Sequence, residues 1–237
     1  MSHIYQYSAI LLLSLCISVT GCKRDATIQT AAGTSRVKTE TTTSGTGIAY
    51  AVSYSYDSSG RQIQAQTDTV ITTYTYGRDT ITKVISLAGE RFITGYTTNS
   101  LGKIISDSKF YKYAYDGNGY LISFSYTGGS DYDSTAYIIS SGDVSSSTEH
   151  QSDSSTDNHI TTTYTYLTTA DPRDYGTAAW GQADKHLLSA KTITQLINGN
   201  TYTTSYTYSY AYDSQGRVSQ QIQTNGSASY ITSYTYY

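Results

Sequence analysis

The chain has 237 residues and a mass of 25.9 kDa, which fits one large β domain or two small ones. Tyr occurs 27 times, Ser 34 times and Thr 39 times, whereas Pro occurs once and charged residues make up 14% of the chain. Tyr and Thr favour strands, and the residues of long surface helices are scarce, so an all-α fold is disfavoured. A net charge of −3 gives no basic surface for nucleic acid.

Residues 1–21 have the pattern of a signal peptide. The apolar run from Ala9 to Val19 is too short to cross a bilayer, which takes about 20 residues. The residues Val19-Thr20-Gly21-Cys22 follow, and they resemble the lipobox of bacterial lipoproteins, although no Lys or Arg precedes the run. The resemblance implies cleavage before Cys22 and its lipidation, which would anchor the chain to a membrane. The alternative is an ordinary secretory signal with a chance Cys.

Residues 22–47 are interpreted as the lipidated Cys and a Thr- and Ser-rich tether. Lys23 and Arg24 follow Cys22, whereas surface-exported lipoproteins of the Bacteroidota are acidic at that point. The expected location is therefore the bacterial cell envelope at the outer membrane, with the periplasmic face slightly favoured over the cell surface.

One unit recurs from residue 48 to residue 237, the Tyr-rich β-repeat domain of this interpretation. Its fullest copies have the pattern Y-x-Y-D-x-x-G and begin at Tyr54, Tyr113 and Tyr210. The two Tyr side chains point to one face of a strand. The Asp and Gly that follow form a turn, in which the Gly accepts a positive φ. The structural turn residues are Asp57, Gly60, Asp116, Gly119, Asp213 and Gly216.

The repeat predicts an all-β fold: an antiparallel up-and-down meander of about 12–14 strands with little or no helix. Strands are expected near 49–56, 61–67, 69–76, 80–87, 91–98, 103–108, 110–115, 120–126, 135–140, 160–167, 189–197, 201–212, 217–224 and 229–236. The sheet is either open and strongly twisted or closed into a barrel. Residues 140–159 are interpreted as a polar loop, and residues 170–188 as a long connection that packs Trp180 on an open end of the sheet.

The Y-x-Y-D-x-x-G-R core resembles the YD repeat of wrapped β-shell proteins. From residue 47 onwards the chain more closely resembles a domain of unknown function in Bacteroidota lipoproteins that is described as porin-like. That resemblance rests on the repeats, the lipobox, the Thr-rich spacer and the segment from Asp174 to Leu188. It implies a barrel-like or half-barrel β fold and no established activity.

A ligand could bind to a Tyr-rich face, because an aromatic ring offers an apolar plate and Tyr adds a polar tip. The candidate ligand face is Tyr54, Tyr56, Tyr113, Tyr115, Tyr210, Tyr212 and Trp180. The competing interpretation is that these rings fill the core, since Leu and Phe are scarce.

Other kinds of site are weaker. The Asp116-Gly-Asn118 stretch starts like a calcium loop but lacks the Glu that would complete it. His150, His159 and His186 lack the spacing of zinc motifs, and no catalytic constellation is present, so no metal, cofactor or enzymatic activity is expected. A transmembrane barrel is disfavoured because neither face of the strands suits hydrocarbon.

The leading hypothesis is a lipid-anchored binding or scaffold protein of the cell envelope that holds a glycan or an envelope protein on its Tyr-rich face. The alternatives are a purely structural assembly partner of an envelope complex and a hydrolase with an unrecognised site. The oligomeric state does not follow from the sequence.

Overall fold

A computed structural model describes residues 35–45, 47, 49–128, 131–152, 157–197, 199–226 and 228–237. The predicted signal peptide, Cys22 and the first part of the predicted tether lie outside these residues. In the part of the chain that is described, no helix is both long and apolar enough to cross a membrane.

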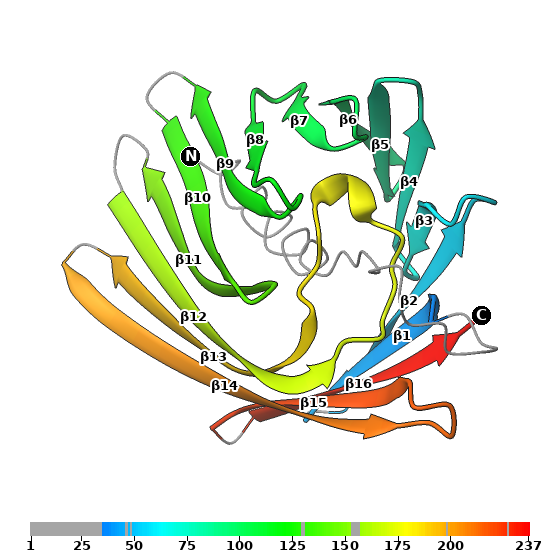
Figure 1. The fold of residues 1–237 in the computed structure, drawn as a ribbon, viewed down its shortest axis with the longest axis vertical. Coiled ribbons are helices and arrows are strands. Elements are labelled where there is room, and N and C mark those ends of the chain that lie inside the picture. The colour runs from blue at the N-terminus through cyan, green and yellow to red at the C-terminus, as the bar shows by residue number, and fades with distance from the viewer. Residues whose placement is uncertain are drawn as a thin grey trace.

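Sixteen antiparallel strands form a closed barrel (Figure 1). Each strand pairs with its neighbours along the chain, and β1 pairs with β16 to close the ring. The predicted all-β meander is confirmed, and the sheet closes into a barrel. The strands are β1 Val37–Ser44, β2 Ala49–Tyr56, β3 Gln62–Gln66, β4 Val70–Tyr76, β5 Thr80–Leu87, β6 Glu90–Thr98, β7 Ile104–Asp107, β8 Lys112–Tyr115, β9 Leu121–Gly128, β10 Asp131–Ser140, β11 Asp143–Ser152, β12 Asp157–Ala170, β13 His186–Ile197, β14 Asn200–Tyr212, β15 Val218–Asn225 and β16 Ala228–Tyr236.

Two of these strands differ from the sequence-based expectation. Strand β1 lies inside the predicted tether of residues 22–47, and β11 lies inside the predicted polar loop of residues 140–159. Both are rich in Thr and Ser, so their apolar alternation is weak. Their ladders are made by the backbone, and a polar outward face is compatible with a strand, so composition alone does not exclude them.

The two faces of the barrel wall differ in composition. In β14 the rings of Tyr206, Tyr208 and Tyr210 alternate with Ser and Thr, and Tyr210 packs on the buried core. The alternate positions therefore face outwards. Outward hydroxyls pair between neighbouring strands, as in Thr39 Oγ1 with Thr235 Oγ1 at 2.6 Å. Strand β14 thus places Tyr inside and Ser or Thr outside, whereas other strands also carry aliphatic residues outside, such as Ile93, which is 61% exposed.

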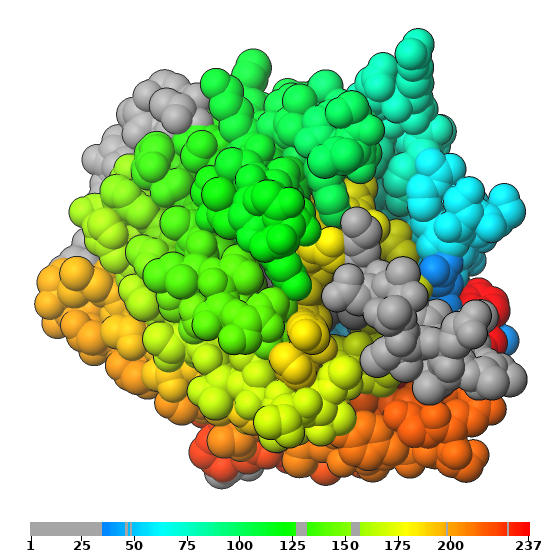
Figure 2. Space-filling view, in the orientation of Figure 1, coloured from blue at the N-terminus to red at the C-terminus, as the bar shows by residue number. Residues whose placement is uncertain are grey.

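The connection between β12 and β13 runs inside the ring of strands (yellow in Figure 1). This plug segment, residues 171–185, contains one short 3₁₀ helix, η1 Ala178–Trp180. Its yellow atoms are visible near the middle of the molecule, between the green and the cyan atoms (Figure 2). Backbone hydrogen bonds tie it to the barrel: Asp174 N–H donates to Ser35 O at 3.1 Å, and Gln182 N–H donates to Gly119 O at 2.9 Å.

The core is built around the plug segment. One cluster contains Val37, Val52, Tyr54, Ala65, Tyr175, Leu187, Val218 and Tyr234. A second contains Ile81, Tyr96 and Ile104, with Trp180 packed against it. The Trp180 and Tyr96 rings meet edge to face at 4.9 Å. Trp180 therefore packs inside the closed ring of strands, together with the rest of the connection between β12 and β13, and not on the end of an open sheet.

The barrel has two different ends. We call the end where even-numbered strands run into odd-numbered ones the plug end; it carries the D-x-x-G turns, the plug segment, and the residues Ser35 and Tyr237. We call the opposite end, where odd-numbered strands run into even-numbered ones, the hairpin end. Its turns are short, as in Ala88-Gly89 between β5 and β6.

Candidate functional site

Tyr hydroxyl groups form a series of hydrogen bonds between neighbouring strands at the plug end. In each case the Tyr near the end of an even-numbered strand donates to a backbone carbonyl near the start of the strand before it. The distances are 2.7–3.0 Å, from Tyr56 to Val37, Tyr76 to Gln62, Tyr166 to Val144, Tyr210 to Leu188 and Tyr236 to Val218. The second Tyr of the pairs 54/56, 74/76, 164/166 and 234/236 therefore has a structural role besides filling space, whereas in the unit that begins at Tyr210 the first Tyr has this role.

Arg173 links the plug segment to the barrel wall. Its side chain is 7% exposed, and its ion-pair partner Asp171 is 6% exposed, at 2.6 Å. The guanidinium also donates to Gln221 Oε1 and to Tyr234 Oη, each at 2.9 Å. This buried guanidinium stabilises one arrangement of the plug segment, because moving the segment would leave the buried charge without its hydrogen-bond and ion-pair partners.

A second polar contact fixes the middle of the plug segment. Tyr175 donates from its hydroxyl to Glu40 Oε2 at 3.1 Å, and its ring meets that of Tyr54 edge to face at 5.4 Å. Burial raises the pKa of Glu40. The carboxyl group of Glu40 is thus part of the interior packing and is not presented to solvent.

The seven residues of the predicted ligand face are spread over different surroundings. Tyr54 is buried in the first core cluster, and Tyr210 packs against that cluster. Tyr113 and Trp180 pack in the second cluster, and Tyr115 donates to Ala179 O at 3.4 Å. Tyr212 is 44% exposed, and Tyr56 lines a pocket at the rim. The structure therefore gives most of these rings a packing role and places Tyr56 at a pocket on the rim.

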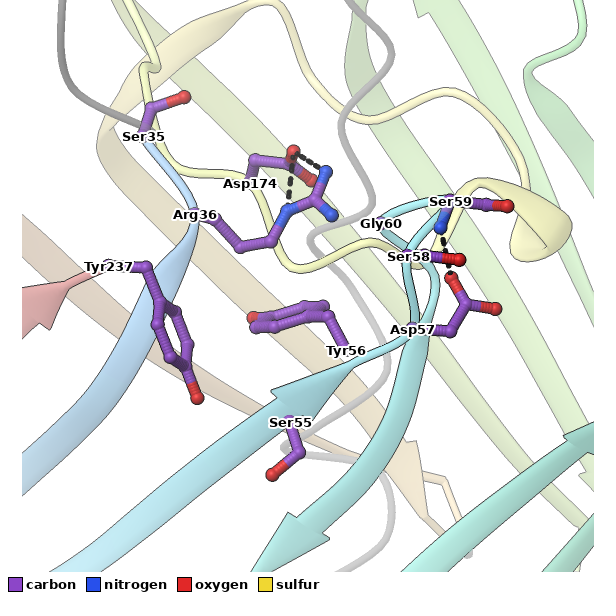
Figure 3. Close-up of a pocket in the computed structure, with 10 residues that line it drawn as sticks. All are labelled: Ser35, Arg36, Ser55, Tyr56, Asp57, Ser58, Ser59, Gly60, Asp174 and Tyr237. Atoms are coloured by element: carbon purple, nitrogen blue, oxygen red, sulfur yellow. Dashed lines mark hydrogen bonds and ion pairs between the residues drawn. The ribbon is translucent and has the colours of Figure 1, made fainter.

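This hollow, the rim pocket, lies at the plug end and has a volume of about 540 Å³. Figure 3 shows how its walls come from distant parts of the chain: the start of β1, the turn after β2, the plug segment and the last residue. It is lined by Ser35, Arg36, Ser55, Tyr56, Asp57, Ser58, Ser59, Gly60, Asp174 and Tyr237.

Arg36 organises the pocket. Its Nη2 lies 2.6 Å from Asp174 Oδ2, and its guanidinium carbon lies 4.9 Å from the centre of the Tyr56 ring (Figure 3). The edge of that ring meets the ring of Tyr237 at 5.9 Å. Tyr237 is 54% exposed, so it is the aromatic ring that the pocket presents to solvent.

The D-x-x-G turn forms the opposite wall. Asp57 Oδ1 accepts the backbone N–H groups of Ser59 and Arg61, both at 2.9 Å. The accepted N–H of Arg61 is the main cause that lowers the pKa of Asp57. Gly60 has a φ of +79°, the left-handed conformation that the pattern predicts. The equivalent turns at Asp116 and Asp213 have the same bonds, with φ of +86° at Gly119 and +76° at Gly216.

The plug segment lies directly against this turn. A Cβ on Gly176 would lie 2.5 Å from Gly60 O, and a Cβ on Gly60 would lie 1.9 Å from Arg36 Nη1. Only glycine fits at either position without a shift of its neighbours. The turn, the plug segment and Arg36 therefore form one tightly packed unit around the pocket.

The composition of the rim pocket suits a polyhydroxylated ligand. Serine hydroxyls both donate and accept hydrogen bonds, a guanidinium donates and a carboxylate accepts, and an exposed Tyr ring covers an apolar face. The sequence pattern identified Tyr56, Asp57 and Gly60. It missed Arg36, Asp174 and Tyr237, because only barrel closure and the inward path of the plug segment bring them together.

His186 belongs to the packing of the plug end. Its Nδ1 lies 2.7 Å from Asp143 Oδ2, and Asp143 also accepts the backbone N–H groups of Lys185 and His186. Asp143 is 5% exposed. This pair anchors the exit of the plug segment into β13.

The fold is similar to that of a porin-like protein from Bacteroides uniformis ATCC 8492, known from its crystal structure. The TM-score is 0.58 and the sequence identity is 15%, with 88% of this chain and 100% of that chain covered. No protein-family model and no curated protein matches the chain, so the YD-repeat resemblance has no family model behind it. The likeness shows that this chain has a porin-like β-barrel fold.

Proposed function

We propose that the protein is a lipid-anchored binding module of the bacterial cell envelope and that its rim pocket holds a glycan. The observation that carries the proposal is the rim pocket itself, where serine hydroxyls and the Arg36–Asp174 pair surround the exposed ring of Tyr237. Saccharides combine hydroxyl groups with apolar ring faces, and the pocket offers a partner for each.

The outer face of strand β14 is polar, which supports contact with water along this part of the wall. A lipid-facing barrel needs an apolar outer band about 25 Å tall. Here the outward positions of β14 are Thr201, Thr203, Ser205, Thr207 and Ser209. These positions of β14 suit water and not hydrocarbon, although other strands place exposed Ile93 and Ile138 on the outer face. Attachment to a membrane would in this proposal use the predicted lipid at Cys22.

The position of the chain ends fits this attachment. Ser35, the first described residue, lines the rim pocket. Cys22 precedes this point by 13 residues in the sequence. The plug end would then be the end tethered to the membrane.

Binding is tested with the purified full-length protein in detergent, screened against envelope polysaccharides and a panel of oligosaccharides. We expect at least one glycan to bind, and Tyr237→Ala to weaken its binding about tenfold, the factor that corresponds to about 1.4 kcal/mol of lost ring contact. Tyr202→Ala is the matched control, because Tyr202 is 56% exposed and lies at the hairpin end. No binding by the wild type, or an equal loss in both variants, would contradict the glycan site.

The anchor is tested separately in cells. Cys22→Ser should release the protein from the membrane fraction while leaving its glycan binding unchanged. Protease treatment of intact and of lysed cells then reports which side of the outer membrane the barrel occupies. A Cys22→Ser protein that stays in the membrane fraction would contradict lipid attachment, and this outcome is independent of the proposed glycan binding.

A further inference from the structure

Two histidines face each other on the outer wall at the hairpin end. His150 of β11 and His159 of β12 are direct register partners in the antiparallel ladder. Their neighbour Ser147 is buried and has the opposite parity along β11, so the two histidines lie on the solvent side of the sheet. Asp157, the first residue of β12, lies beside them and pairs with Ser152.

The three side chains converge on one point. Asp157 Oδ1 lies 2.7 Å from His150 Nε2 and 3.4 Å from His159 Nε2. The imidazole rings are stacked, with centroids 4.1 Å apart and planes 14° apart. Tyr132 of β10 packs edge-on against His150 at 5.3 Å, which holds that ring from the other side.

This arrangement is that of a chelate. One atom from each residue can act as a ligand, and all three atoms lie within 4.8 Å of one another. A tetrahedral zinc ion at about 2.0–2.1 Å from each ligand places the ligand atoms about 3.4 Å apart. The Asp157 side chain is 67% exposed, so it can move by the small amount that this requires.

We infer that His150, His159 and Asp157 bind a divalent transition-metal ion, with solvent completing the coordination. Two imidazole nitrogens and one carboxylate oxygen suit Zn²⁺, Cu²⁺ or Ni²⁺, whereas Ca²⁺ and Mg²⁺ prefer ligand sets made of oxygen. Cu²⁺ binds most tightly in the series of divalent ions, and Zn²⁺ is the ion for which three protein ligands and one open position are most usual.

The ligand groups bind metal in their deprotonated forms, as a neutral imidazole ring and an ionised carboxylate. The hydrogen bond from His150 lowers the pKa of Asp157, which keeps the carboxylate ionised. The nine-residue separation of the histidines explains why motif spacing misses the site: a β-hairpin, and not a helix, brings them together.

The test is a titration of the untagged full-length protein with ZnCl₂ and with CuCl₂ by calorimetry, followed by electron paramagnetic resonance of the Cu²⁺ form. We expect one ion per chain and coupling to two imidazole nitrogens. His150→Gln and His159→Gln should each weaken binding at least as much as the loss of an outer-shell partner does, about 10–100-fold.

Asp157→Asn should also weaken binding, and Asp79→Asn is its control because the side chain of Asp79 is 68% exposed and lies far from the site in the chain. Saturating Zn²⁺ should raise the melting temperature of the wild type and of the control but not of the two histidine variants. Coupling to a single nitrogen, or equal affinity in the wild type and the double histidine variant, would overturn the site. Neither result depends on the rim pocket.

Discussion

The two ends of the barrel are held in different ways although the same strands run through both. At the plug end, Tyr hydroxyl groups donate to carbonyls, the core clusters pack on the plug segment, and Arg173 forms a buried ion pair. At the hairpin end, Tyr50 and Tyr202 lie on strand positions of the inner face but are 55% and 56% exposed. These two Tyr side chains therefore lack the packing that their counterparts have at the plug end.

The difference shows that position in the barrel, and not residue type, decides what a Tyr does. In β2, Tyr54 is 4% exposed and Tyr50 is 55% exposed, although they are four residues apart on the same face. The plug segment covers one and not the other. Substitutions matched between the two ends should therefore have unequal effects.

The largest effect is expected at Arg173. Arg173→Met leaves the buried carboxylate of Asp171 without its cation and removes the donors to Gln221 and Tyr234. We expect the free energy of unfolding to fall by about 3–5 kcal/mol, measured by urea denaturation. Arg78→Met is the control, because that side chain is 96% exposed, and it should change stability by less than about 0.5 kcal/mol. Equal losses in the two variants would contradict a plug segment held by its ion pair.

The next effect is a pH dependence at Asp184, also in the plug segment. Burial raises the pKa of Asp184 to about 6, while its carboxylate accepts the N–H of Val144 at 2.8 Å. A raised pKa in the folded state means that the protonated form is favoured there. Its contribution to stability is present below the unfolded pKa of about 3.9 and is lost as the pH rises through about 6.

Asp184→Asn keeps the acceptor for Val144 and cannot ionise. The variant should therefore gain stability over the wild type between pH 4.5 and pH 7.5, by about 2–3 kcal/mol at the upper limit, since about 1.4 kcal/mol corresponds to a tenfold change in proton affinity. Thermal or urea unfolding at several pH values measures the gain. If the difference in stability between Asp184→Asn and the wild type did not change with pH, Asp184 would not be the cause of the pH dependence.

The smallest effect is expected from a single Tyr hydroxyl group. Tyr76→Phe removes the donor to Gln62 O at 2.7 Å and should cost about 1 kcal/mol. Tyr202→Phe at the hairpin end should be close to neutral, because the hydroxyl of this exposed side chain can hydrogen-bond to water. Two equal melting temperatures would show that the hydroxyl groups at the plug end contribute no stability.

The sequence predicts much of this architecture and little of the site. Alternating Tyr and the D-x-x-G turns are local signals, so the strands and turns near Asp57, Asp116 and Asp213 follow from short windows. Strands β1 and β11 do not, because their inner positions carry polar residues such as Glu40 and Glu149. A carboxyl group at an inner position can be predicted only if its partner in the fold is known, and the partner of Glu40 is Tyr175 of the plug segment.

The rim pocket and the histidine cluster share one reason for being missed. Both depend on residues that are distant along the chain or that face each other across a ladder, such as Arg36 and Asp174, or His150 and His159. The alternation of residues within one strand does not predict these contacts. They follow from register and closure, which the pattern of a single strand leaves undetermined.

The pairing of β1 with β16 has a kinetic consequence. Thr39 and Thr235 meet although 196 residues separate them, so the ring closes only after most of the meander exists. Contacts of such long range make folding slow, because the closure entropy is lost before the contact forms. Until then β1 and β16 expose unpaired edges that can recruit other chains. A chain that lacks residues 37–44 should therefore remain an open sheet with two free edges and aggregate during refolding at concentrations where the full-length protein does not.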